Sequence, residues 1–80
     1  MSYLLDQLRN SYPSSKSEFN SISRQVGEEI SRLLDLAREA NHTYNNHVDQ
    51  KKYGAQANEL QEAFNEYDSR VGHDGYERLP

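Results

Sequence analysis

An apolar stripe through residues 15–46 constrains the fold of this chain more than any other feature. Its members recur at steps of three or four residues: Phe19, Ile22, Val26, Ile30, Leu33, Ala37, Ala40 and Tyr44. That spacing keeps all of them on one side of an α-helix. At the start of the stripe, Ser15-Lys16-Ser17-Glu18 has the pattern of a capping box, in which serine and glutamate side chains satisfy free amides. The sequence therefore predicts a helix over residues 15–46, about 45 Å long.

A second apolar stripe follows, and its residues alternate between steps of four and three, as in one seam of a coiled coil. They are Tyr53, Ala57, Leu60, Phe64, Tyr67 and Val71. We expect a second helix over residues 50–71, with Gly72 after its last turn because glycine readily adopts the left-handed conformation that ends helices. Residues 73–80 are predicted to form a flexible C-terminal tail.

The stretch between the two stripes, residues 41–49, is poor in helix-forming residues. Asn45 and Asn46 are the expected turn, since asparagine tolerates left-handed backbone. Asp49 would then be the N-cap of the second helix. A first helix that continues and breaks only at Gly54 is the alternative. A short turn between two such stripes predicts an antiparallel helical hairpin.

A short helix is predicted over residues 2–12, ahead of Pro13. Leu4, Leu5 and Leu8 fall on one face of it, and proline pushes the residue before it out of the helical region. So short a helix is not stable alone in water, so we expect it to pack across one end of the hairpin. The predicted fold class is all-α, with the whole chain forming one small domain.

Composition limits both stability and function. A chain of 80 residues buries a small share of its surface, and it has no cysteine for disulfides or thiolate metal sites. We therefore expect dimerisation to complete the hairpin to a bundle. The net charge of −4 argues against direct nucleic-acid binding, which requires clustered Lys and Arg. The absence of a long apolar run or a signal-peptide pattern predicts a cytoplasmic protein that does not bind membranes.

The sequence carries none of the common catalytic, phosphate-binding or calcium-binding motifs. His42 and His47 are five residues apart, which places them on different faces of a helix and does not match the spacing of a zinc pair. Paired carboxylates act as acid and base only in a cleft that shifts one pKa, and no stretch predicts such a cleft. We therefore predict that the protein is not an enzyme and uses no metal or cofactor.

The stretch with the least balanced charge, residues 54–68, holds four carboxylates and no basic residue. Such a helix face either engages a basic groove on a partner or is simply solvated. Tyrosines beside the first helix are further candidates because tyrosine is favoured in interfaces, although packing at the core or its rim is the alternative. The candidate partner-binding residues are Glu59, Glu62, Glu66, Asp68, Tyr3 and Tyr12.

From these features we predict a non-enzymatic interaction protein, a small inhibitor or regulator of a macromolecular partner with a basic surface. A viral origin, as a phage-type inhibitor of a host-defence or nucleic-acid-handling complex, is one hypothesis. An alternative is a homo-oligomer that sequesters a small ligand such as a nucleotide. Its candidate residues are Arg9, Lys16, Arg24, Lys51 and Lys52, with Tyr12 or Tyr44 stacking on a base. A further alternative is a structural or assembly-chaperone subunit whose seam pairs with a longer coiled coil.

Overall fold

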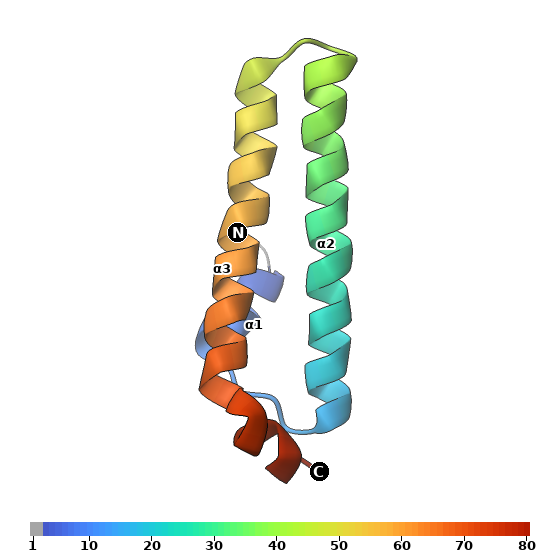
Figure 1. The fold of residues 1–80 in the computed structure, drawn as a ribbon. Helices are drawn as coiled ribbons and strands as arrows, with labels where there is room; N and C mark the ends of the chain where they lie inside the picture. Colours follow the sequence, from blue (N-terminus) through green and yellow to red (C-terminus); the bar gives the residue numbers. More distant parts are fainter. Residues whose placement is uncertain (1–2) are drawn as a thin grey trace.

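The computed structural model describes residues 3–80 and contains three α-helices in that range: α1, Tyr3–Asn10; α2, Lys16–His42; and α3, His47–Arg78. No residue from 3 to 80 is in a β-strand, which confirms the predicted all-α class. α2 and α3 lie antiparallel and side by side as a long hairpin, and α1 packs along one half of it (Figure 1). The molecule is an elongated rod with extents of 48 × 19 × 17 Å.

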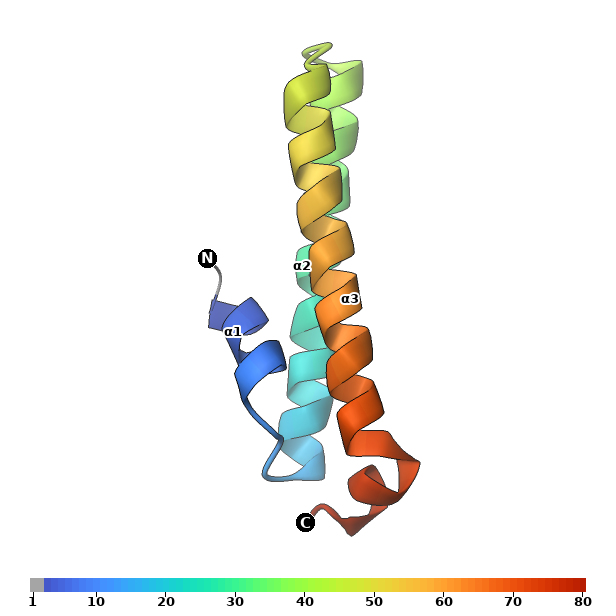
Figure 2. The same ribbon diagram turned by 90° about the vertical axis from the view of Figure 1, so that its left-hand side faces the viewer.

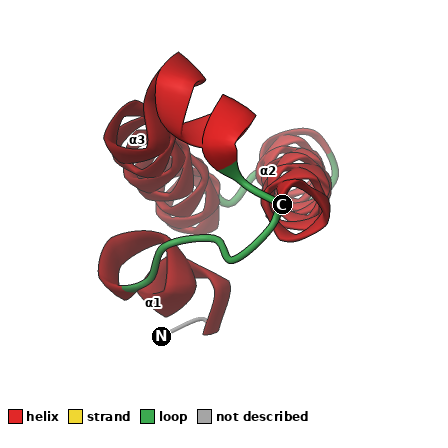
Figure 3. Cartoon of the chain, turned by 90° about the horizontal axis from the view of Figure 1, so that it is seen from below, coloured by secondary structure: helices red, strands yellow, loops and turns green. Residues whose placement is uncertain are grey.

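α1 lies beside α3 and also contacts α2, so that the three helices form a triangle when the rod is seen from its end (Figure 3). Ser2, the predicted first residue of this helix, lies outside the described residues. The helix ends at Asn10, two residues earlier than predicted, because Pro13 restricts the backbone before it. Ser11 closes the last turn, since its amide and its hydroxyl both donate to the Gln7 carbonyl, at 3.0 and 2.6 Å.

The predicted capping pattern at the start of α2 is present in altered form. Ser15 Oγ accepts a hydrogen bond from the Glu18 amide at 3.0 Å, as expected. The Glu18 carboxylate, however, reaches back to Ser14, accepting from its hydroxyl and from its amide, the latter at 2.7 Å. The bond from the Ser14 hydroxyl, followed by the bond from its amide, lowers the pKa of the Glu18 carboxyl below its usual value of 4.5.

The turn between α2 and α3 occupies residues 43–46, and Asn45 has the positive φ (51°) expected of asparagine in such a turn. α2 ends four residues before its predicted end, and α3 begins at His47, three residues before its predicted start. The N-cap of α3 is Asn46, whose side-chain oxygen accepts from the Asp49 amide at 3.0 Å. The prediction that Asp49 is the cap is therefore wrong, because an asparagine caps the helix nearly one turn earlier.

The core lies in the half of the rod that α1 covers. Its buried side chains come from all three helices: Leu5, Leu8, Ile22, Val26, Leu60, Ala63 and Tyr67. Phe19 packs against them with its ring stacked on Tyr67, at a centroid distance of 5.8 Å and an interplanar angle of 8°. Both predicted stripes therefore supply buried residues to the contact between α2 and α3. Tyr44 is the exception, because α2 has already ended there and the side chain is 68% exposed.

Residues 73–78 are helical, within the segment 73–80 for which the sequence predicts a flexible tail. Gly72 breaks α3 with a φ of 67° and a ψ of 172°, and residues 73–78 then form a short helical segment after the bend (Figure 2). The Tyr76 ring lies edge-on to Phe19 at 5.3 Å, and its hydroxyl accepts from the Asn20 side chain at 3.3 Å. These contacts to α2 supply the packing that so short a terminal helix needs.

Gly72→Ala is expected to destabilise the protein by about 1–3 kcal/mol, because positive φ with extended ψ is open almost only to glycine. Gly27→Ala is the matched control, since Gly27 is exposed within α2 and a β-carbon there meets nothing within 4 Å. That substitution should raise stability by about 0.5–1 kcal/mol. Urea unfolding followed by circular dichroism measures both, and equal effects would contradict the break at Gly72.

Candidate functional site

Three of the four candidate carboxylates lie on one side of α3. Glu59, Glu62 and Glu66 are spaced by three and four residues, so they line one face, and all three are exposed. Asp68 follows Glu66 by two residues, about 200° around the helix, and borders a cleft beside Tyr76 on the other flank. The acidic face is therefore defined here as Glu59, Glu62 and Glu66, without Asp68.

The acidic face is only partly neutralised by its own chain. Arg9 of α1 forms an ion pair with Glu59 at 3.5 Å, and both side chains are exposed. Glu62 accepts a hydrogen bond from Asn58 at 3.4 Å. Within residues 3–80, neither Glu62 nor Glu66 takes part in an ion pair. Two uncompensated negative charges are therefore exposed to solvent.

Arg70 lies one turn after Glu66 but is turned toward α1. Its guanidinium donates to the carbonyl oxygens of Leu8 and Arg9 at the C-terminal end of α1, the latter at 3.1 Å. Carbonyls at a helix C-terminus lack helical partners and carry the negative end of the dipole, so a cation stabilises them. Sequence reasoning does not single out Arg70, and its only signal is its position as the first basic residue after the acidic stretch.

The two candidate tyrosines flank α1. Tyr3 is 78% exposed and borders a shallow groove with Gln25 and Glu28 of α2, away from the acidic face. Tyr12 is 53% exposed, and its hydroxyl lies where a β-carbon on Gly75 would come within 2.8 Å. Tyr12 therefore packs partly against the C-terminal turns, while Tyr3 offers most of its ring to solvent.

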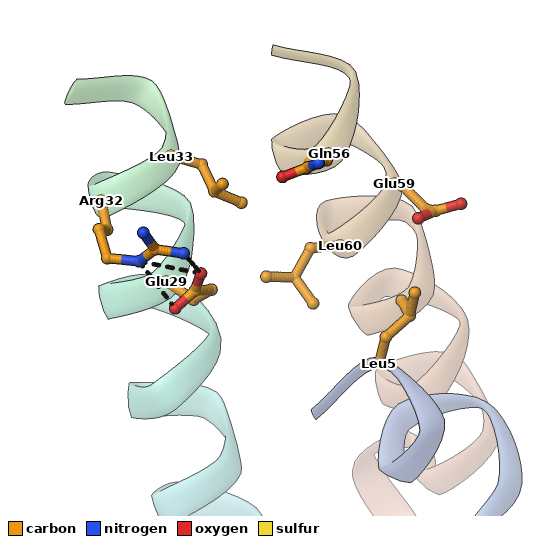
Figure 4. A pocket seen from close by; sticks show the side chains of 7 residues that line it. All are labelled: Leu5, Glu29, Arg32, Leu33, Gln56, Glu59 and Leu60. Atoms are coloured by element: carbon orange, nitrogen blue, oxygen red, sulfur yellow. Dashed lines mark hydrogen bonds and ion pairs between the residues drawn. The ribbon is translucent and has the colours of Figure 1, made fainter. Parts of the chain in front are cut away.

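A cleft of about 300 Å³ opens between α2 and α3 just beyond the N-terminal end of α1. Its lining residues are Leu5, Glu29, Arg32, Leu33, Gln56, Glu59 and Leu60. Leu33 and Leu60 approach each other from the two long helices (Figure 4). Arg32 is hydrogen-bonded and ion-paired to Glu29, which raises the pKa of its guanidinium. With two carboxylates and one paired guanidinium, the cleft does not favour an anionic ligand.

The basic residues that a nucleotide site would need are dispersed within one chain. Arg24 pairs with Glu28 at 3.0 Å, while Lys16 and Lys52 lie over different tyrosine rings, at 5.8 and 5.5 Å from their centroids. In the described part of the chain, no group of three or more His, Asp or Glu side chains is placed to hold a metal ion. A site for an anionic ligand built from these basic residues would have to form between subunits.

Comparisons with family models, with curated proteins and with solved structures find no match to this chain. None of the helices in residues 3–80 combines the length and the apolar character needed to cross a membrane. The surfaces described above are therefore the basis for inferring function.

Proposed function

We propose that this protein is a non-enzymatic interaction module that binds a basic surface of a macromolecular partner through the acidic face. One observation carries the proposal. Glu62 and Glu66 are exposed without a basic partner, while the arginine one turn away, Arg70, is committed to α1. Unpaired surface charges steer and orient association with an oppositely charged surface. A protein that inhibits or regulates by covering such a surface needs no chemistry of its own.

The acidic face lies on the part of α3 that packs against the core. About a quarter turn around the same stretch of helix, Leu60, Ala63 and Tyr67 are buried in the core. Because this packing holds the helix in place, the three carboxylates are presented at fixed spacing along it. A surface that is already ordered loses little conformational entropy when it binds, which favours association.

The paired reversal Glu62→Lys with Glu66→Lys is expected to weaken binding to a basic probe by about tenfold or more, because attraction becomes repulsion at both positions. Helicity should be unchanged, since both residue types favour helix. The probe is a lysine-rich synthetic peptide of about ten residues. Binding is measured by titration with NMR detection of the α3 amides.

The matched control is Asp74→Lys with Glu77→Lys, which changes the net charge equally at two exposed positions after the bend in α3. Binding through the acidic face predicts that this control retains most of the affinity. Equal losses in both double variants would show attraction to net charge alone. Unchanged affinity in the first variant would also contradict the proposal.

Two finer hypotheses concern the identity of the partner and the oligomeric state. A basic partner in a host-defence or nucleic-acid-handling complex, met in the cytoplasm by a phage-type inhibitor, is consistent with an exposed acidic face. The homodimer expected from the sequence needs a different surface, because two acidic faces repel each other.

A further inference from the structure

α1 covers only half of the hairpin, and we propose that a second copy of this protein covers the other half. The open half is defined as residues 33–56, which are the last turns of α2, the hairpin turn and the first turns of α3. The N-terminal end of α1 lies near Leu60, where Leu5 lines the cleft (Figure 4), and α1 does not extend along the open half (Figure 2). This surface is distinct from the acidic face, so the inference does not rest on the proposed function.

The most exposed large apolar side chains lie at the two ends of this uncovered stretch. Tyr3, at the free end of α1, is 78% exposed, and Val48 and Tyr44, at the hairpin turn, are 77% and 68% exposed. Between these ends, Leu36 follows the cleft residue Arg32 by one turn, so it lies on the same side of α2 as the cleft, and it is only partly buried. Burying apolar surface is favourable, so a covering partner is favoured.

The distribution of charge selects a second copy as that partner. The open half holds equal numbers of basic and acidic residues: Arg38, Lys51 and Lys52 against Asp35, Glu39 and Asp49. The whole net charge of −4 therefore falls on the remainder of the chain. Two open halves can face each other without net repulsion, whereas the remaining parts of the two copies carry like net charge and repel each other.

The same distribution fixes the orientation of the two copies. Antiparallel packing places the two acidic parts at opposite ends of the assembly. Their separation there exceeds the Debye length, which is ~8 Å at physiological ionic strength, so their repulsion is screened. Parallel packing would place them side by side. The antiparallel arrangement is a closed two-fold dimer, in which a contact from one protomer to its partner is repeated in reverse. Its middle is a four-helix bundle, and each end keeps its own α1.

This arrangement brings the hairpin turn of each protomer against the free end of α1 in its partner. Tyr3 of one copy then lies against Val48 of the other. Within one chain these residues are well separated, because Val48 precedes Leu60 by twelve residues, about 18 Å along α3, and the N-terminal end of α1 lies near Leu60. Coupling between positions 3 and 48 would therefore report a contact between copies.

Light scattering over a concentration series tests the dimer, and we expect a mass of twice 9.3 kDa for the native protein. Val48→Asp is expected to weaken the dimer by tenfold or more, because it places a charge in an apolar contact twice. An acidic residue in the first turn of α3 suits the helix dipole, so the fold should remain intact. Leu34→Asp is the matched control, since Leu34 is 46% exposed on the flank of α2 that carries Asn20, away from the cleft. That variant should remain dimeric.

A charge pair tests the orientation. Tyr3→Lys alone should also weaken the dimer. Combining it with Val48→Asp in one chain should restore the dimer, because opposite charges then meet at both contacts between the two copies. A native protein that is monomeric throughout the series would overturn the proposal. A dimer that tolerates Val48→Asp, or that does not recover in the double variant, would overturn the contact proposed here. Binding of the lysine-rich peptide to Val48→Asp, measured in parallel, separates this result from any failure of the acidic face.

Discussion

Tyr67→Ala is expected to lower the free energy of unfolding by about 3–5 kcal/mol, a large part of the stability of a domain this small. Tyr67 is completely buried. Its ring is stacked on Phe19 and lies 6.3 Å from Phe64, in the same cluster as Leu8 of α1. Truncation would therefore open a cavity where all three helices meet. Urea unfolding followed by far-ultraviolet circular dichroism measures the loss.

Tyr67→Phe separates the contribution of the ring from that of the hydroxyl. Tyr67 Oη is buried without a hydrogen-bond partner among residues 3–80, and an unpaired buried polar atom costs about 1–3 kcal/mol. The phenylalanine variant should therefore be at least as stable as the native protein. A variant less stable by more than the error of the measurement would contradict the absence of a partner for this hydroxyl.

The pH dependence of stability gives a second readout for the same hydroxyl. Burial, followed by the nearby negative charge of Glu18, raises the pKa of Tyr67 above its usual value of 10.0. Because the folded pKa is higher than the unfolded one, the contribution of Tyr67 is present below pH 10 and is lost as pH rises through the folded pKa. The native protein should therefore lose more stability above pH 10 than Tyr67→Phe does.

Local sequence rules predict the hairpin because its signals are local. Helical spacing within each stripe, the Ser15 cap and the turn at Asn45 all act over a few residues, and the structure contains each of them. The errors arise where two local solutions compete. Asn46 and Asp49 are both good N-caps, and Asn46 prevails because its side-chain oxygen accepts from the amide of Asp49.

Features that depend on distant contacts could not be predicted from local patterns. The segment 73–78 is too short to be a stable helix alone, and it is held by the contact of Tyr76 with Phe19, which is distant in sequence. The candidate site likewise combines a feature set by local sequence with one set by a distant contact. The spacing of the acidic face follows from helical periodicity, whereas the commitment of Arg70 to α1, which leaves Glu66 unpaired, depends on where a separate helix docks.

Leu8→Ala is expected to cost about 2–5 kcal/mol and to release α1 from the hairpin. α1 has eight residues, and only Leu5 and Leu8 are buried, the latter completely. A helix of that length does not persist in water once it is undocked. Hydrogen exchange of the α1 amides should therefore become fast while the amides of α2 remain protected. Leu4→Ala, a half-buried leucine in the same helix, is the control and should leave α1 docked.

Release of α1 would affect the two proposed surfaces differently. On the acidic face, Arg9 would leave Glu59, but Arg70 would leave the carbonyls of α1 and become free to pair with Glu66 one turn away. One carboxylate loses its partner while another gains one, so affinity for the lysine-rich peptide should change little. Tyr3 would leave its place against the hairpin turn of the partner, so the dimer should weaken. A dimer that is unchanged in Leu8→Ala would show that docked α1 takes no part in the contact between copies.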